Sequence, residues 1–320
     1  MAWLKLAAFI ACCSLINAVP AQSFPLKPLR MVVAYPPGGP VDVVARSLGL
    51  ALQEPLGQPV VIENRAGAGG IVGTEFVARA APDGYTLLLT STPLAIQETL
   101  YAKLPYAALR DFALIADAGS GPQMLVVHPD VPAKTVQELV ALAKARPGKL
   151  NYASPSSGGA NHLAGEMLKS MAGIDVVHVP YKGGAPAEAD LLGGRVTFMF
   201  HSLPAAMQQV RAGRLRALAV TSPQRVRTAP EVPTVAESGL PGFEVTSWYG
   251  VVGPAQLPRE IVTRVNSAVN QALANPQMVE RLASLGVEAT PKTPEQFGEF
   301  VRRDIGKWAK VIKDSGATAD

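Results

Sequence analysis

The sequence predicts an α/β protein made of two units, each a sheet covered by helices. Short runs rich in β-branched residues alternate with runs of helical period, which is typical of βαβ units and largely parallel sheets. The second half of the chain repeats this alternation, and 320 residues are enough for two domains of ordinary size. A chain that leaves one unit, builds a second and returns would form two lobes with a cleft between them, although composition alone does not establish the return.

The first half of the chain contains three predicted strands. Each is a short β-rich run, and the third follows the turn Pro82-Asp83-Gly84. The helix after the first strand carries Val44, Leu48 and Leu52 at four-residue spacing, which is the period of a buried helix face. The expected strands are Leu29–Ala34, Val60–Glu63 and Thr86–Thr90, with a further helix from about Ile71.

Two capping boxes mark helix starts in the second half. Thr135 is followed three residues later by Glu138, and Thr293 is followed by Gln296. The first capping box opens an expected helix that ends near Pro147, and another helix is expected from about Asn161. Two more are expected over Pro258–Leu273 and Gln277–Leu285, and the second capping box opens a last helix that ends near Ser315. The expected strands are Leu150–Ser154, Val176–Val179, Val196–Phe200, Leu215–Val220 and Trp248–Gly253.

The first 21 residues are typical of a secretory signal and are left out of the fold prediction. They combine one positive charge at Lys5, an apolar stretch from Leu6 to Ile16 and a small-residue end at Val19-Pro20-Ala21. A lipoprotein signal that uses Cys12 is the alternative. We expect export to the periplasm, and an exported chain without cysteine because Cys12 and Cys13 both lie in this segment.

Composition excludes several functional classes. A chain without cysteine has no thiol nucleophile, zinc–thiolate site or iron–sulfur cluster. The formal net charge of +4 is modest, and the densest basic segment, Arg211 to Arg227, has little aromatic interleaving, so no nucleic-acid partner is expected. The histidines show no metal-ligand spacing, so no metal is expected; they are His128, His162, His178 and His201. No cofactor is expected either.

The first glycine loop, "PPGGPVD", follows a strand and precedes a helix. Its glycines allow backbone N–H groups to point into a cleft, and the helix N-terminus adds partial positive charge, so an anion is the expected guest. No Gly-Lys-Ser/Thr ending follows, so it is not a phosphate loop of the Walker kind. Asp42 is placed either to cap the helix or to meet a cationic group of a ligand. A plain structural turn remains the alternative.

The second glycine loop, Ser154 to His162, has the same position relative to its own strand and helix. Two such loops, one in each half, could hold one small anion between them with neutral dipoles, since neither contains Lys or Arg. A third loop, Gly67 to Gly73, nearly matches the dinucleotide fingerprint but has Val72 where the last glycine belongs, so nucleotide binding is not expected.

Catalytic motifs are sparse. No Gly-x-Ser-x-Gly elbow occurs in the sequence, so an α/β-hydrolase nucleophile is unsupported. An enzyme that uses His162 or His201 near Ser154 or Ser156 is the remaining catalytic alternative, but the sequence shows no pair of a base and an orienting group. We therefore predict a binding protein without enzymatic activity.

The chain resembles the Bug family, the periplasmic solute receptors of tripartite tricarboxylate transporters. The resemblance runs through the whole chain after the signal segment, in ordered blocks that include "YPPGGPVDVVAR", "ENRAGAGG", "PDGYTLLLT", "HVPYKGGAPAEADLLGG" and "SWYGVVGPA". It implies a type II periplasmic-binding-protein fold, in which two α/β lobes joined by crossing strands close on a ligand. The implied lobes are residues 24–124 plus 247–320 and residues 125–246.

The resemblance also implies where a ligand binds. Family members hold a ligand carboxylate between the two glycine loops, partly through ordered water. Carried onto this sequence, the expected ligand-binding residues are Tyr35, Gly38, Gly39, Pro40, Val41, Asp42, Ser91, Ser154, Ser156, Ser157, Gly158, Gly159, His162 and His201.

This chain departs from the family pattern at several of these positions. Val41 stands where Thr is usual, Ser156 and Gly159 stand at the usual Gly and Thr positions, and His201 replaces a common Asp. An Asp can accept from a ligand ammonium group, whereas a His can donate and, if protonated, favours a second negative charge. Ligands with a free amino group, such as aspartate, are therefore expected to bind less tightly than dicarboxylates or aromatic acids.

The expected function is capture of a small dicarboxylate, tricarboxylate or aromatic acid by a periplasmic receptor that acts as a monomer. Lobe closure would present the bound acid to the membrane permease subunits of a tripartite transporter. The alternative is a ligand sensor whose closed form docks on a membrane signalling protein, because both partners would recognise the same closure.

Overall fold

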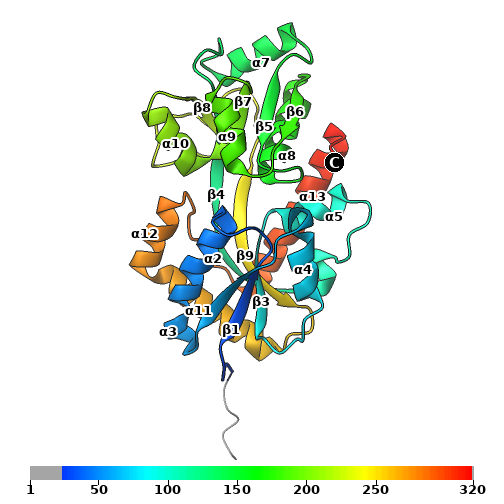
Figure 1. Cartoon of the computed structure of the whole chain (residues 1–320), viewed down its shortest axis with the longest axis vertical. Coiled ribbons are helices and arrows are strands. Elements are labelled where there is room, and N and C mark those ends of the chain that lie inside the picture. Colours follow the sequence, from blue (N-terminus) through cyan, green and yellow to red (C-terminus); the bar gives the residue numbers. More distant parts are fainter. Residues whose placement is uncertain (1–23, 319–320) are drawn as a thin grey trace, which may run out of the picture.

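A computed structural model describes residues 24–318 of the chain. The predicted signal segment, residues 1–21, and its two cysteines lie outside the described residues. Figure 1 shows two α/β lobes: a lower one built from the early (blue to cyan) and late (orange) parts of the chain, and an upper one built from the middle (green). Among residues 24–318, no helix has both the length and the apolar character needed to cross a membrane.

The lower lobe is organised around a mixed sheet in the order β2-β1-β3-β9-β4. β1 pairs in parallel with β2 and β3, whereas β9 runs antiparallel to β3 and β4. The carboxyl ends of β1, β2 and β3 therefore share one edge of the sheet. These strands are β1 (Leu29–Val33), β2 (Val60–Asn64), β3 (Thr86–Ser91), β4 (Phe112–Val127) and β9 (Thr246–Pro254).

The upper lobe uses the far end of β4, which pairs antiparallel with β7 and β8. β5 lies parallel to both β6 and β7, so the carboxyl ends of β5 and β7 also share an edge. The strands of this lobe are β5 (Asn151–Ser154), β6 (Val177–Pro180), β7 (Phe198–Ser202) and β8 (Arg216–Val220).

Helices cover both faces of the two sheets. In the lower lobe they are α2 (Pro40–Ala51), α3 (Gln53–Leu56), η1 (Ala68–Gly70), α4 (Ile71–Ala78), α5 (Pro93–Leu100), α6 (Ala108–Asp111), α11 (Arg259–Ala274) and α12 (Pro276–Ser284). In the upper lobe they are α7 (Val136–Ala145), α8 (Ala160–Ala172), α9 (Gly184–Leu192) and α10 (Leu203–Arg211). The last helix, α13 (Pro294–Ser315), packs against α5 of the lower lobe and α8 of the upper lobe (Figure 1).

One apolar cluster runs through both lobes. It joins Leu88 and Val252 in the lower sheet to Phe198 and Phe200 in the upper sheet, with Trp248 on β9 in the same cluster. Separate clusters fill the second face of each sheet. The shared cluster means that β4, β9 and α13 form a packed connection between the lobes rather than a loose linker.

The predicted α/β class and the predicted two lobes are confirmed, and each expected strand is present within about two residues of its expected bounds. The capping box at Thr293 is also confirmed, because Thr293 accepts from the Gln296 N–H and Gln296 accepts from the Thr293 N–H. At Thr135 only half of the box forms. The Thr135 hydroxyl accepts the Glu138 N–H, but the Glu138 carboxylate accepts the N–H of Lys134 and not that of Thr135.

The long strand β4 was not predicted, because its middle reads as a turn. Gly119, Gly121 and Pro122 interrupt the apolar run, and the pairing with β9 shifts register at this point. The glycines allow close packing: a Cβ at Gly119 would lie 2.6 Å from the Glu288 carbonyl oxygen, and one at Gly121 would collide with the Gly286 carbonyl oxygen. The segment after α12 therefore crosses β4 in direct backbone contact.

Candidate ligand-binding site

The first glycine loop connects β1 to α2, as predicted. Gly38 has a φ of +81°, which favours glycine, and Gly39 is the N-cap residue of α2 with an extended backbone and no side-chain cap. The first intrahelical bond runs from the Val43 N–H to the Gly39 carbonyl at 3.0 Å. The N–H groups of Val41 and Asp42 precede this bond and form the positive end of the helix.

The side chain of Asp42 closes this loop from within the protein. Its carboxylate accepts the Gly38 N–H at 2.9 Å, the Arg46 Nε–H at 2.9 Å and the Asn64 amide at 2.8 Å, and only 2% of the residue is exposed. Burial alone would raise the pKa of Asp42, but the hydrogen bonds from Arg46, Gly38 and Asn64 outweigh it and the pKa is lowered. Asp42 is therefore an ionised acceptor that shapes the loop.

The second glycine loop, between β5 and α8, has the same construction. Gly158 has a φ of +72°, and Gly159 is the N-cap residue of α8, again extended and without a side-chain cap. The Gly158 N–H donates to Nδ1 of His162 at 3.1 Å, and the first intrahelical bond joins the Leu163 N–H to the Gly159 carbonyl at 3.0 Å. In both loops the residue three places after the N-cap glycine closes back on the preceding glycine, an Asp in one lobe and a His in the other.

The second loop lies at the boundary between the lobes. Gly158 packs so closely against Leu100, the last residue of α5, that a Cβ would lie 2.5 Å from Cδ2 of that leucine. Figure 1 places α2 at the top of the lower lobe and α8 at the bottom of the upper lobe. Each lobe thus has a helix N-terminus without a side-chain cap on the side that is directed toward the other lobe.

Tyr35 and Ser91 lie at the edge of the lower sheet beside the first loop. Burial raises the pKa of Tyr35 to about 12, although a hydrogen bond with Ser91 opposes the rise, so the phenol stays protonated. Its ring rests on Gly70, where a Cβ would lie 3.0 Å from Cζ of Tyr35. The third glycine loop is therefore a packing surface for this ring.

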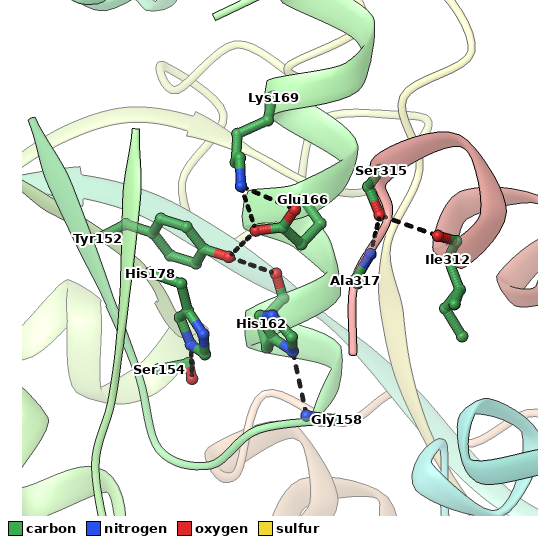
Figure 2. A network of polar contacts seen from close by, with 10 residues as sticks. All are labelled: Tyr152, Ser154, Gly158, His162, Glu166, Lys169, His178, Ile312, Ser315 and Ala317. Carbon is green, nitrogen blue, oxygen red and sulfur yellow. Dashed lines mark hydrogen bonds and ion pairs between the residues drawn. The ribbon is translucent and has the colours of Figure 1, made fainter. Parts of the chain in front are cut away.

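Ser154 lies beside three stacked rings, those of Tyr152, His178 and His162 (Figure 2). Its Oγ donates to the Ser156 carbonyl at 2.9 Å and lies 2.6 Å from Nε2 of His178. The His178 ring stacks on His162 with centroids 3.9 Å apart and on Tyr152 at 4.9 Å. Ser154 is fully buried, so this serine supports the loop from inside, whereas His178 is only partly buried.

His201 is engaged inside the upper lobe. Its Nδ1 accepts the Ser202 N–H at 3.0 Å, so the ring proton sits on Nε2, which lies 3.3 Å from the Glu188 carboxylate of α9. The pKa of His201 is lowered because burial outweighs the attraction of Glu188. The ring is therefore neutral near pH 7, and the direct ligand contact expected for it stays a prediction.

Two asparagines that are not among the predicted ligand-binding residues hold the loops in place. Asn64, at the end of β2, donates to the Tyr35 carbonyl at 3.1 Å as well as to Asp42. Asn161, in the first turn of α8, donates to the Phe200 carbonyl at 2.7 Å. Both residues stand in or beside the motifs that point to the site, but their partners are distant in sequence, so no spacing rule identifies their role.

A cavity of about 740 Å³ opens elsewhere in the upper lobe, between α7, β8 and the segment that follows β8. The arginines that line this cavity already have partners within the protein. Arg216 donates to the carbonyls of Pro129, Val131 and Ala133. Arg225 is paired with Glu237. This outer cavity therefore offers mainly satisfied groups, whereas the paired loops present helix N-termini without side-chain caps.

The sequence matches the family described as the tripartite tricarboxylate transporter family receptor over residues 44–317. The chain belongs to this receptor family. Two relatives extend the match: Protein BugT of Bordetella pertussis is 40% identical over 311 residues, which cover 97% of this chain and 95% of BugT. A UPF0065 protein from the tcbD-tcbE intergenic region of Pseudomonas sp. strain P51 is 42% identical over 292 residues, or 91% of this chain and 87% of the relative.

Solved structures of similar proteins share the receptor fold. The periplasmic binding protein BugD is 37% identical with a TM-score of 0.81, over 93% of this chain and 100% of BugD. A Rhodopseudomonas palustris protein solved with adipate is 33% identical with a TM-score of 0.85, over 93% and 100% of the two chains. MatC from the same organism, solved with malate, is 32% identical with a TM-score of 0.81, over 90% and 100%.

These likenesses confirm the predicted family and the two-lobe binding-protein fold. The protein is a solute-binding receptor and not an enzyme, because its family and its structural neighbours are binding receptors.

Proposed function

We propose that this receptor captures a small organic acid by gripping one carboxylate between the two glycine loops. The observation that carries the proposal is the repeated loop construction, in which a strand is followed by a glycine with positive φ and then by an extended N-cap glycine, once in each lobe. Helix N-termini bind anions because their first N–H groups have no intrahelical partner and the helix dipole favours negative charge. In this proposal the groups that contact the acid are those of the two loops together with Tyr35 and Ser91.

The charge around the two glycine loops suits one carboxylate of the ligand between them, with the ligand's other polar groups lying further from the loops. Neither loop contains Lys or Arg, and the Asp42 carboxylate is balanced by Arg46. Binding would therefore rest on backbone dipoles, which suit a singly charged end of a longer acid. The adipate and malate found in two structural neighbours are acids of this kind.

Capture by lobe closure is the second part of the proposal. We assign residues 24–124 and 247–320 to the lower lobe and residues 125–246 to the upper lobe, with β4 and β9 as the crossing strands. An acid that contacts both loops favours the closed arrangement by its differential affinity. The closed receptor would then dock on the permease subunits of a tripartite tricarboxylate-type transporter.

A thermal-shift screen of the chain without residues 1–21 tests the proposal. The panel contains adipate, malate, citrate, benzoate and aspartate, and a true ligand raises Tm by mass action. We expect at least one carboxylate without an amino group to raise Tm more than aspartate does. A panel in which no acid changes Tm would contradict the proposal.

A matched pair of variants separates a loss of ligand binding at the first loop from a general loss of stability. Asp42→Ala removes the acceptor for the Gly38 N–H, and Asp111→Ala removes a carboxylate that accepts the Ala107 N–H in the same way. Asp111 lies at the opposite end of the lower sheet, because β4 begins beside Pro254. Asp42→Ala is expected to abolish the ligand-dependent rise in Tm, whereas Asp111→Ala keeps it.

The residue at position 201 tests the class of acid. His201 offers no negative acceptor to a ligand ammonium group, so aspartate is expected to bind less tightly than a dicarboxylate of similar length. Titration calorimetry with aspartate and malate on the wild type and on His201→Asp compares the two. Tight binding of aspartate by the wild type would contradict this preference.

A further inference from the structure

The bond between Gly158 and His162 requires a neutral imidazole. A backbone N–H can only donate, so Nδ1 of His162 must accept, and its lone pair must carry no proton. A protonated imidazole has N–H groups at both nitrogens and no acceptor. Protonation of His162 would therefore turn the closing bond of the upper loop into two donors that face each other at 3.1 Å.

The lower loop has no such sensitivity near neutral pH. Asp42 fills the corresponding place, and its hydrogen bonds with Arg46, Gly38 and Asn64 keep its pKa below the usual carboxyl range. It accepts the Gly38 N–H throughout the range in which an imidazole gains its proton, between about pH 5 and 8. The two loops are thus built alike but respond differently to acid.

We propose that His162 is a positioning residue that couples capture of the acid to pH through the Gly158 N–H. With a neutral ring, the upper loop is closed and the first N–H groups of α8 are held toward the lower lobe. With a protonated ring, Gly158 is released and the loop no longer presents those groups together. This inference rests on the proposed function, because it concerns the same two loops.

The groups around the His162 ring set the pH range over which the ring would gain its proton. His178 on β6 stacks on the His162 ring at 3.9 Å, so a charge on either ring opposes a charge on the other. The hydroxyl of Tyr152 on β5 lies 3.3 Å from the His162 carbonyl oxygen and 2.7 Å from the Glu166 carboxylate (Figure 2). The Glu166 carboxylate also accepts from the Lys169 ammonium group. Glu166 is one turn further along α8, and Lys169 partly balances its charge.

The neighbouring elements add few further charges. Figure 2 shows the end of α13 beside α8 with uncharged residues, Ile312, Ser315 and Ala317. The charged residues of that turn, Lys313 and Asp314, are exposed. From the lower lobe, the residue packed on Gly158 is the apolar Leu100. We therefore expect the pH response to depend on His178, which stacks on the ring, and on Glu166, one turn along α8.

The first arm of the test needs no ligand. NMR spectra of the labelled chain without residues 1–21 follow the Gly158 amide and the ring nitrogens of His162 from pH 8.5 to 5. We expect Nδ1 of His162 to be unprotonated at pH 8.5, and the Gly158 amide shift to follow the protonation of His162. A Gly158 amide that does not move while the ring titrates overturns the proposal.

The second arm measures affinity for adipate by calorimetry in the same buffers. One pH unit below the midpoint of the Gly158 titration, about a tenth of the rings are neutral, so the affinity of the wild type is expected to fall about tenfold. His162→Asn keeps an acceptor near the position of Nδ1 but does not titrate, so its affinity is expected to vary with pH far less. His128→Asn is the control: His128 also accepts a backbone N–H, from Asp130, at a distance from the loops.

The outcomes separate this inference from the proposed function. If the wild type and His162→Asn lose adipate affinity equally on acidification, the inference is wrong although the receptor binds acids. If adipate binds neither protein at any pH, adipate is not the ligand, and the Gly158 titration alone decides whether His162 controls the loop.

Discussion

Asn64 donates its side-chain amide to Asp42 at 2.8 Å and so ties the end of β2 to the first turn of α2. The same amide reaches the Tyr35 carbonyl, which fastens the first loop at both ends. In the upper lobe, Asn161 ties the first turn of α8 to β7 through the Phe200 carbonyl. Each glycine loop is therefore held by an asparagine: Asn64 lies outside the first loop, and Asn161 lies near the end of the second, in the first turn of α8.

Removing either asparagine should weaken binding. Asn64→Ala and Asn161→Ala each free a loop end, and the loss of about 1.4 kcal/mol of positioning corresponds to a tenfold lower affinity. Calorimetry with the acid that most raises Tm checks this. Asn151→Ala is the control, because Asn151 binds Thr197 and the Arg195 carbonyl at the start of β5, and its affinity should equal that of the wild type.

A buried carboxylate holds the crossing strand β9 on the last helix. Asp304 accepts the indole N–H of Trp248 at 2.8 Å and that of Trp308 at 2.9 Å. Asp304→Ala leaves two buried donors unpaired, so we expect a loss of about 2–4 kcal/mol in the free energy of unfolding, measured by urea denaturation. Asp314→Ala, which removes an exposed pair with Lys310, should change it by less than about 1 kcal/mol.

The lowered pKa of His201 gives a stability that depends on pH. Since the unfolded chain binds this proton more readily, the stabilising effect is complete above the ordinary value of 6.5 and is lost as the pH falls below it. Urea denaturation at pH 7.5 and 5.5 should show a larger loss of stability for the wild type than for His201→Asn. An equal or larger loss in the variant would mean that the pKa of His201 is not lowered.

Glycines in two helices should respond oppositely to alanine. In α8, a Cβ at Gly165 would overlap the Tyr152 ring, so Gly165→Ala is expected to lower the free energy of unfolding by about 1–3 kcal/mol. In α13, a Cβ added at Gly306 would have no atom within 4 Å, so Gly306→Ala should raise the free energy of unfolding by about 0.5–1 kcal/mol. Thermal and urea denaturation check both, and a stabilised Gly165→Ala would show that the Tyr152 ring moves freely.

Local sequence rules recovered the strands and the two glycine loops because their signals lie within a few residues. Turn residues bound each strand, and the spacing from strand to glycine to helix is visible at Gly38 and Gly158. Strand β4 was missed for a tertiary reason. The glycines at 119 and 121 look like a turn, but they permit the close backbone approach of residues 286–288.

The roles within the site were harder to predict than its location. Asp42 was expected to cap the helix or to meet a ligand cation, and the structure shows that it closes the loop on Gly38. Neither the stack of His162 and His178 nor the contact of Gly158 with Leu100 follows from spacing, because each joins residues from different elements. Such contacts depend on how the lobes pack.

A crystal structure with the acid that most stabilises the receptor tests the central claim most directly. The account predicts one ligand carboxylate within hydrogen-bonding reach, directly or through one water, of the first N–H groups of both α2 and α8. An acid bound in the outer cavity beside Arg216, or one whose carboxylates contact only a single loop, would contradict it.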